Sequence, residues 1–182
     1  MTGSISSARA STLWIVLLTV ASTAATFVLA CAAPFSALAA LAAVHMRRRD
    51  GIVLVLCVWL VGQAVGFGFL DYPHDPKTLT WALGLGTAAV GSVLAAYCAL
   101  GRMGGAPVAA RLAVAYLAGF VGFKAVVLFW ASILGGVAIT LHPIYSLDQF
   151  FRNGAILIAL YALYRGLVAL GVPPARPAPA VA

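Results

Sequence analysis

Residues 52–70 read IVLVLCVWLVGQAVGFGFL, and this stretch decides the class of fold. Its 19 residues include one polar side chain, Gln63, and no charge. As an α-helix rising 1.5 Å per residue it would be about 28 Å long, close to the hydrocarbon thickness of a bilayer. The stretch therefore predicts a transmembrane helix.

Similar apolar stretches recur along the chain, at residues 13–33, 79–100, 111–141 and 155–170, with a shorter one at 35–46. Of the 182 residues, 64% are hydrophobic and 8% are charged, whereas a soluble domain is about one-quarter charged. Alternating patterns typical of a transmembrane barrel are not visible. We therefore expect an all-α, polytopic membrane helix bundle. Residues 1–12 would form a polar N-terminal segment, 13–170 a single transmembrane domain, and 171–182 a disordered Pro/Ala-rich tail.

The number of spans depends on Pro34. Residues 13–44 would form a helix about 48 Å long, too long for one crossing. Proline disfavours helix in the residue before it, so Pro34 divides this block. If Pro34 marks a turn, we expect about six spans and a cytoplasmic N-terminus. If it marks only a kink, five spans and an external N-terminus follow.

The net charge of +7 is placed in the connections between apolar stretches, which indicates membrane topology rather than nucleic-acid binding. Alternate connections carry seven basic residues on one side against Lys77 and Arg152 on the other. The seven are Arg47, Arg48, Arg49, Arg102, Arg111, Arg165 and Arg176. The positive-inside rule then predicts a multi-pass inner-membrane protein whose Arg47–Arg49 connection and C-terminus are cytoplasmic.

No catalytic or cofactor motif is present. The chain has no GxSxG, P-loop or HExxH sequence, and no Glu, so we expect neither an enzyme nor a cofactor. Its three cysteines lie in separate apolar stretches without CxxC spacing. His74, Asp75 and His142 could converge as a weak metal site on the outer face. The alternative, in which His74 lies in a turn and His142 ends a helix, leads us to assign no metal.

The candidate ligand-binding residues fall into two groups. Gln63 and Lys124 lie midway through apolar stretches, where a charge costs about 2.5–3.5 kcal/mol and usually faces protein or water. The others lie near the outer ends of the spans: Tyr72, His74, Asp75, Trp81, Tyr145, Asp148 and Gln149. Alternatives remain open for both groups. Lys124 could extend to the cytoplasmic edge, Gln63 could bond another helix, and the aromatic residues could be interface anchors.

Small residues recur four apart in several stretches, a spacing that lets helices approach closely. The pairs are Ala21 and Ala25, Gly62 and Gly66, Gly84 and Ala88, and Ala115 and Gly119. They predict either packing within the bundle or a surface that docks on another membrane subunit.

The architecture resembles that of an established family. The shared features are the chain length, about six hydrophobic spans, small residues in the first helix (Ala21, Ala25), a short second segment and polar-aromatic outer loops. The chain is similar to the substrate-binding S component of energy-coupling factor vitamin transporters. This resemblance implies a protein that binds a vitamin-like metabolite or metal ion at its outer face. Uptake would then need a separate transmembrane coupling subunit and ATPases. The alternative function is a non-transporting scaffold or assembly factor of a larger membrane complex.

Overall fold

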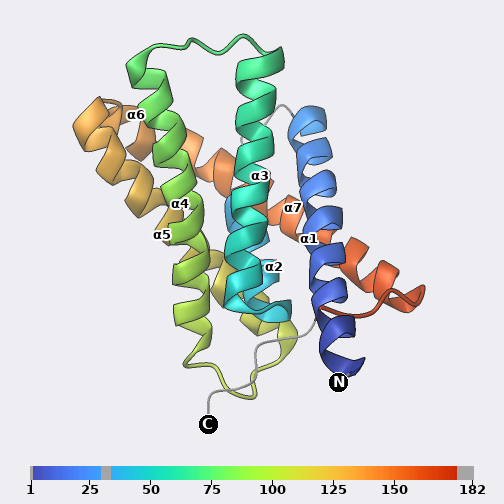
Figure 1. Ribbon diagram of the computed structural model, residues 1–182. Helices are drawn as coiled ribbons and strands as arrows, with labels where there is room; N and C mark the ends of the chain where they lie inside the picture. Colours follow the sequence, from blue (N-terminus) through green and yellow to red (C-terminus); the bar gives the residue numbers. More distant parts are fainter. Residues whose placement is uncertain (1, 30–33, 176–182) are drawn as a thin grey trace.

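The computed structural model describes residues 2–29 and 34–175, which form seven helices and no strand (Figure 1). The helices are α1 (Thr2–Leu29), α2 (Phe35–His45), α3 (Arg48–Phe69), α4 (Pro76–Leu100), α5 (Val108–Leu134), α6 (Val137–Leu141) and α7 (Pro143–Ala169). This architecture confirms the predicted α-helical membrane bundle. The predicted polar N-terminal segment is helical from Thr2 onward.

The bundle has two distinct ends (Figure 1). One end holds the start of α1, the connection from α2 to α3 and the connection from α4 to α5. We call it the basic end, because it carries Arg47, Arg48, Arg49, Arg102 and Arg111. The other end, here the far end, holds residues 70–75 and α6. Helix α7 crosses the bundle obliquely from the far end (Figure 1).

Helices α1 and α2 run in opposite directions on the two sides of Pro34 (Figure 1). This reversal agrees with a turn rather than a kink, although residues 30–33, including Cys31, lie outside the described part. Helices α3, α4 and α5 are long and apolar enough to cross a membrane. Residues 9–24 of α1 and the whole of α2 are shorter apolar helices. The total of six spans therefore stays a prediction.

Helix α2 occupies the centre of the bundle. Every residue from Phe35 to Val44 is buried, and α3, α4, α5 and α7 pack around it. Its many alanines let these neighbours approach closely, so this short helix has no surface left for lipid. At its end, the Tyr97 hydroxyl on α4 donates to the carbonyls of Ala42 (2.9 Å) and Met46 (3.0 Å). Backbone groups at a buried helix terminus need such partners.

Tryptophans from α3 and α5 lie against glycines of α4. A Cβ on Gly86 would lie 2.8 Å from the Trp59 ring, and a Cβ on Gly84 would lie 3.0 Å from the Trp130 ring. The Trp59 indole donates to the Ala82 carbonyl at 2.9 Å, which satisfies its buried N–H. The predicted small-residue positions on α4 therefore serve packing within the bundle.

The apolar stretch 111–141 is not one helix. Helix α5 ends at Leu134, and Gly135 and Gly136 follow with φ of 87° and 108°. Glycine reaches this region without a Cβ clash, so the pair ends α5 and starts the short α6. The predicted last span, 155–170, in contrast, is part of a longer continuous helix, α7, with Pro143 in its first turn.

The first part of the predicted disordered tail contacts the bundle. The Trp14 indole of α1 donates to the Pro173 carbonyl at 2.8 Å. Ala175 is only 3% exposed. The chain after α7 thus returns to α1, while residues 176–182, including Arg176, lie outside the described part.

Candidate functional site

Lys124 lies on α5, and its side chain reaches the short helix that follows. Its Nζ donates to the Thr140 carbonyl of α6 at 3.3 Å, and the Ser146 hydroxyl of α7 donates to the same oxygen at 3.3 Å. The two glycines after α5 allow α6 to pack against both α5 and α7. Lys124 therefore lies where three helices meet, and it extends toward α6 rather than toward the basic end.

Aromatic rings form one wall beside Lys124. The ammonium lies 5.9 Å from the centre of the Phe120 ring, a distance at which a cation is attracted to an aromatic face. Phe120 contacts Phe150 of α7 with ring centres 5.2 Å apart. The Tyr116 hydroxyl donates a short hydrogen bond to the Phe150 carbonyl. These contacts hold α5 against α7 beside Lys124.

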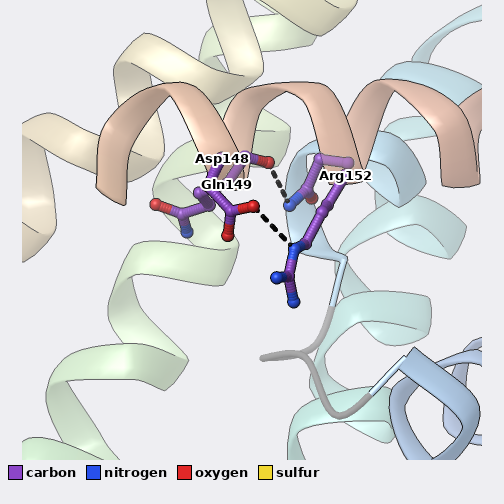
Figure 2. Close-up of polar contacts among 4 residues, drawn as sticks. Asp148, Gln149 and Arg152 are labelled. Carbon is purple, nitrogen blue, oxygen red and sulfur yellow. Dashed lines mark hydrogen bonds and ion pairs between the residues drawn. The ribbon is translucent and has the colours of Figure 1, made fainter. Parts of the chain in front are cut away.

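Within the described residues, no carboxylate pairs with Lys124. The sole ion pair there joins Arg152 Nε and Asp148 Oδ1 at 2.9 Å, one turn apart on α7 (Figure 2). The backbone carbonyl of Gln149 accepts from Asn153 Nδ2 at 2.9 Å. The side-chain amide of Gln149 points away from Arg152 (Figure 2). An ammonium has three donors, and one backbone carbonyl occupies only one of them. Lys124 thus retains capacity to bind an anion.

Tyr72, His74 and Asp75 lie together in the connection between α3 and α4. The ring of Phe67 lies 5.9 Å from Tyr72 and 5.4 Å from His74. Tyr72 also covers Gly66, where an added Cβ would lie 2.5 Å from its ring. The aromatic side chains of this connection therefore fold back onto the end of α3.

Asp75 is the N-cap of α4. Its carboxylate accepts from the backbone N–H groups of Lys77 (2.9 Å) and Thr78 (3.1 Å), and from the Thr78 hydroxyl (2.6 Å). These bonds, the one from the Thr78 hydroxyl foremost, hold the pKa of Asp75 below its usual range. Both carboxylate oxygens are thus engaged in starting α4.

The remaining predicted residues lie between these groups. Trp81 of α4 approaches the turn after α5, where a Cβ on Gly136 would lie 3.9 Å from its ring. The ring centres of His142 and Tyr145 lie 5.0 Å apart at the start of α7. Gln63 is half-buried on α3, and its amide bonds none of the described residues. The structure therefore brings Lys124 close to the start of α7. Trp81 of α4 lies beside the turn between α5 and α6.

His74, Asp75 and His142 do not form a metal cluster. In the described ranges, no three side chains among His, Cys, Asp and Glu come together as a set of metal ligands. His74 and His142 contact aromatic rings, and Asp75 caps α4.

A second polar group, at the basic end, was missed by sequence reasoning. His45 ends α2, and its ring lies 5.9 Å from Tyr161 and 4.4 Å from Tyr164. Tyr164 lies in turn 4.6 Å from Trp14 of α1. On α7, Tyr164 and Arg165 follow Tyr161 by three and four residues. This helical spacing is the sequence signal that could have placed both beside Tyr161 on one face.

The shallow depression beside His45 is too narrow to hold a water molecule, and its wall is mainly apolar. It is lined by Trp14, Leu18, Leu41, His45, Met46, Tyr164 and Ala175.

No protein-family model, curated protein or solved structure matches the chain.

Proposed function

We propose that this membrane protein binds a small anionic molecule at the far end, for uptake with separate energising subunits. One observation carries the proposal: Lys124 lies within an apolar span, and among the described residues its ammonium has one carbonyl and one aromatic ring as neighbours. A charge at this depth is costly unless it is compensated. A ligand carboxylate or phosphate would supply the missing partner.

The position of Lys124 supports capture from one side of the membrane. It meets α6 and α7 at the far end, away from the arginines of the basic end. If the basic end faces the cytoplasm of the inner membrane, as the positive-inside rule predicts, the far end is external. The wall of Phe120, Tyr116 and Phe150, with Tyr145, Asp148 and Gln149 on the adjoining turns of α7, combines apolar surface with a few polar groups. Small-molecule sites have this composition.

The resemblance to S components extends this proposal to partners. Such a protein would bind a vitamin-like metabolite and deliver it with a transmembrane coupling subunit and ATPases. The chain would bind no nucleic acid and would catalyse no reaction itself. Its ligand would have to be anionic to satisfy Lys124, which favours a carboxylated or phosphorylated metabolite over a metal ion.

The scaffold alternative draws less support from the packing. It was based on small residues that could grip another subunit, yet Gly84, Ala88, Ala115 and Gly119 are buried within the bundle. Of the other pairs, Gly66 is covered by Tyr72, Gly62 is open, and Ala25 lies outside the described side chains. On α3, therefore, only Gly62 of the pair is open to another subunit, and one glycine offers a smaller contact surface than the small-residue pairs buried inside the bundle.

The test is the substitution Lys124→Met, which keeps the aliphatic stem and removes the charge. Lys77→Met is the matched control, because Lys77 is an exposed lysine at the same end. The three proteins are purified in mild detergent, and small molecules that co-purify are identified by mass spectrometry. We expect an anionic metabolite with the wild type and Lys77→Met that is absent from Lys124→Met.

Since the substitution removes an unpaired charge, Lys124→Met should also be at least as heat-stable as the wild type. Equal retention of the same metabolite by Lys124→Met, at wild-type abundance, would refute the proposed site.

A further inference from the structure

Positive charge at the basic end lacks internal compensation. Seven described arginines lie on segments that reach or run toward this end: Arg9, Arg47, Arg48, Arg49, Arg102, Arg111 and Arg165. The acid among them is Asp50, whose carboxylate accepts from the Ser11 hydroxyl at 2.8 Å. No ion pair joins any of these arginines to an acid in the described part of the chain. The end therefore presents a surplus of positive charge.

Two buried nitrogen atoms at this end have no hydrogen-bond partner among the described residues: His45 Nε2 and Arg111 Nε. Buried polar atoms of this kind are uncommon and indicate a bound water, an ion or a functional site. His45 ends α2, and Arg111 lies in the first turn of α5. Helices α2 and α5 pack against each other, with the ring centres of Phe35 and Phe123 5.9 Å apart, and they run in opposite directions, so the last turn of α2 and the first turn of α5 lie at the same end (Figure 1).

The surrounding rings fix the geometry of these groups. His45 is stacked on Tyr161, with ring centres 5.9 Å apart, and it contacts Tyr164. The Tyr161 hydroxyl accepts from Arg165 at 3.4 Å, which directs that guanidinium along the same face of α7. An imidazole and two guanidinium groups, contributed by α2, α5 and α7, are thus present at the same end of the bundle, with Arg165 bonded to Tyr161.

We propose that His45, Arg111 and Arg165 bind a phosphate group at the basic end. Guanidinium groups form strong, directional hydrogen bonds with phosphate oxygens, and an imidazole can donate one more from Nε2. Basic pockets between transmembrane helices near the bilayer surface bind anionic lipid headgroups in this way. The phosphate could belong to an anionic phospholipid or to a soluble molecule, and the experiment separates these two sources. The site is independent of ligand capture at the far end.

The test measures the unfolding temperature of the detergent-solubilised full chain. One arm titrates phosphatidylglycerol against zwitterionic phosphatidylcholine, and the other titrates sodium phosphate against sodium chloride at equal ionic strength. We expect phosphatidylglycerol or sodium phosphate to raise the unfolding temperature of the wild type more than its reference does. A response only to phosphatidylglycerol assigns the site to a lipid, and a response to sodium phosphate assigns it to a soluble phosphate.

Arg111→Gln tests the site, and Arg102→Gln is its control. Both remove one positive charge from the basic end, but Arg102 is exposed in the connection between α4 and α5. Loss of a charged hydrogen bond should raise the half-saturating concentration about tenfold or more in Arg111→Gln. Arg102→Gln should change it less than about twofold, because an exposed charge acts only through screened attraction.

His45→Phe supplies a second test, which does not depend on the folding of Arg111→Gln. The phenyl ring keeps the stacking with Tyr161 and removes the unpaired nitrogen, so the unliganded protein should be at least as stable as the wild type. Its response to the phosphate-bearing probe should weaken. Equal responses to phosphatidylglycerol and phosphatidylcholine together with no response to phosphate would overturn the proposal. Equal losses in Arg111→Gln and Arg102→Gln would also overturn it, because they would indicate charge attraction without a site.

Discussion

Gly122→Ala tests the close contact between α4 and α5. A Cβ on Gly122 would lie 2.6 Å from the Cβ of Ala95 and 3.0 Å from the carbonyl oxygen of Gly91. Carbon atoms in ordinary contact are about 3.5–4.0 Å apart, so the overlap is about 1 Å. Because the atoms that it meets are backbone or Cβ atoms, no rotamer change can relieve it. The two helices would have to separate.

The expected cost follows from two opposing effects. Overpacking of a well-packed interior costs about 1–3 kcal/mol, while alanine in place of glycine favours a helix by about 1 kcal/mol. Gly62→Ala is the matched control, since its added Cβ would meet nothing within 4 Å. Both variants share the effect on the helix. The difference between them should therefore give the overpacking cost alone, about 1–3 kcal/mol in the free energy of unfolding.

The assay is reversible unfolding in mixed micelles with increasing sodium dodecyl sulfate, followed by tryptophan fluorescence. We expect Gly122→Ala to unfold at a lower detergent fraction than the wild type, and Gly62→Ala at an equal or higher fraction. A midpoint for Gly122→Ala at or above that of Gly62→Ala would show that α4 and α5 are not in this contact.

Two further predictions concern the ends of the bundle. Asp75→Asn should weaken the start of α4. It should also reduce the loss of stability that the wild type shows as the pH falls below about 4, because the folded-state pKa of Asp75 lies below its ordinary 3.8. Thermal unfolding at pH 3 to 7 measures this, and an unchanged pH profile would contradict it. Trp14→Phe removes the hydrogen bond to Pro173, which is worth about 1 kcal/mol. The residues after α7 should then be cleaved roughly five times faster in limited proteolysis. An unchanged cleavage rate would show that other contacts hold these residues.

The fold class could be predicted from sequence because apolar length is set by bilayer thickness. Stretches 52–70 and 79–100 are close to the bounds of α3 and α4. The pair Gly135 and Gly136 interrupts the apolar stretch 111–141 in the sequence, but hydrophobicity does not change across it, so the end of the helix at their positive φ was not predicted. The central burial of α2 was equally invisible, because an alanine-rich segment is compatible with lipid, an interface or a protein interior.

The candidate site was predictable only in part. Lys124 could be identified because a charge within an apolar stretch has few explanations, yet its acceptor on α6 depends on how the chain turns after α5. Asp75 was assigned to ligand binding, whereas the structure shows its carboxylate occupied as a helix cap. The group around His45 depends on three helices that are distant in sequence. Periodicity within one helix reports which side chains share a face, but not what that face meets.

The enclosure of α2 has a consequence for how the protein is made. The helix has 11 residues, or about 16 Å, which is roughly half the thickness of the hydrocarbon layer. It leaves the ribosome before α3, α4, α5 and α7, the four helices that surround it in the finished molecule. Neither the lipid nor its own length can hold it across the bilayer during that interval. Synthesis must therefore keep the segment after Pro34 in a provisional place, beside α1 or within the insertion machinery, until α5 and α7 emerge and close around it.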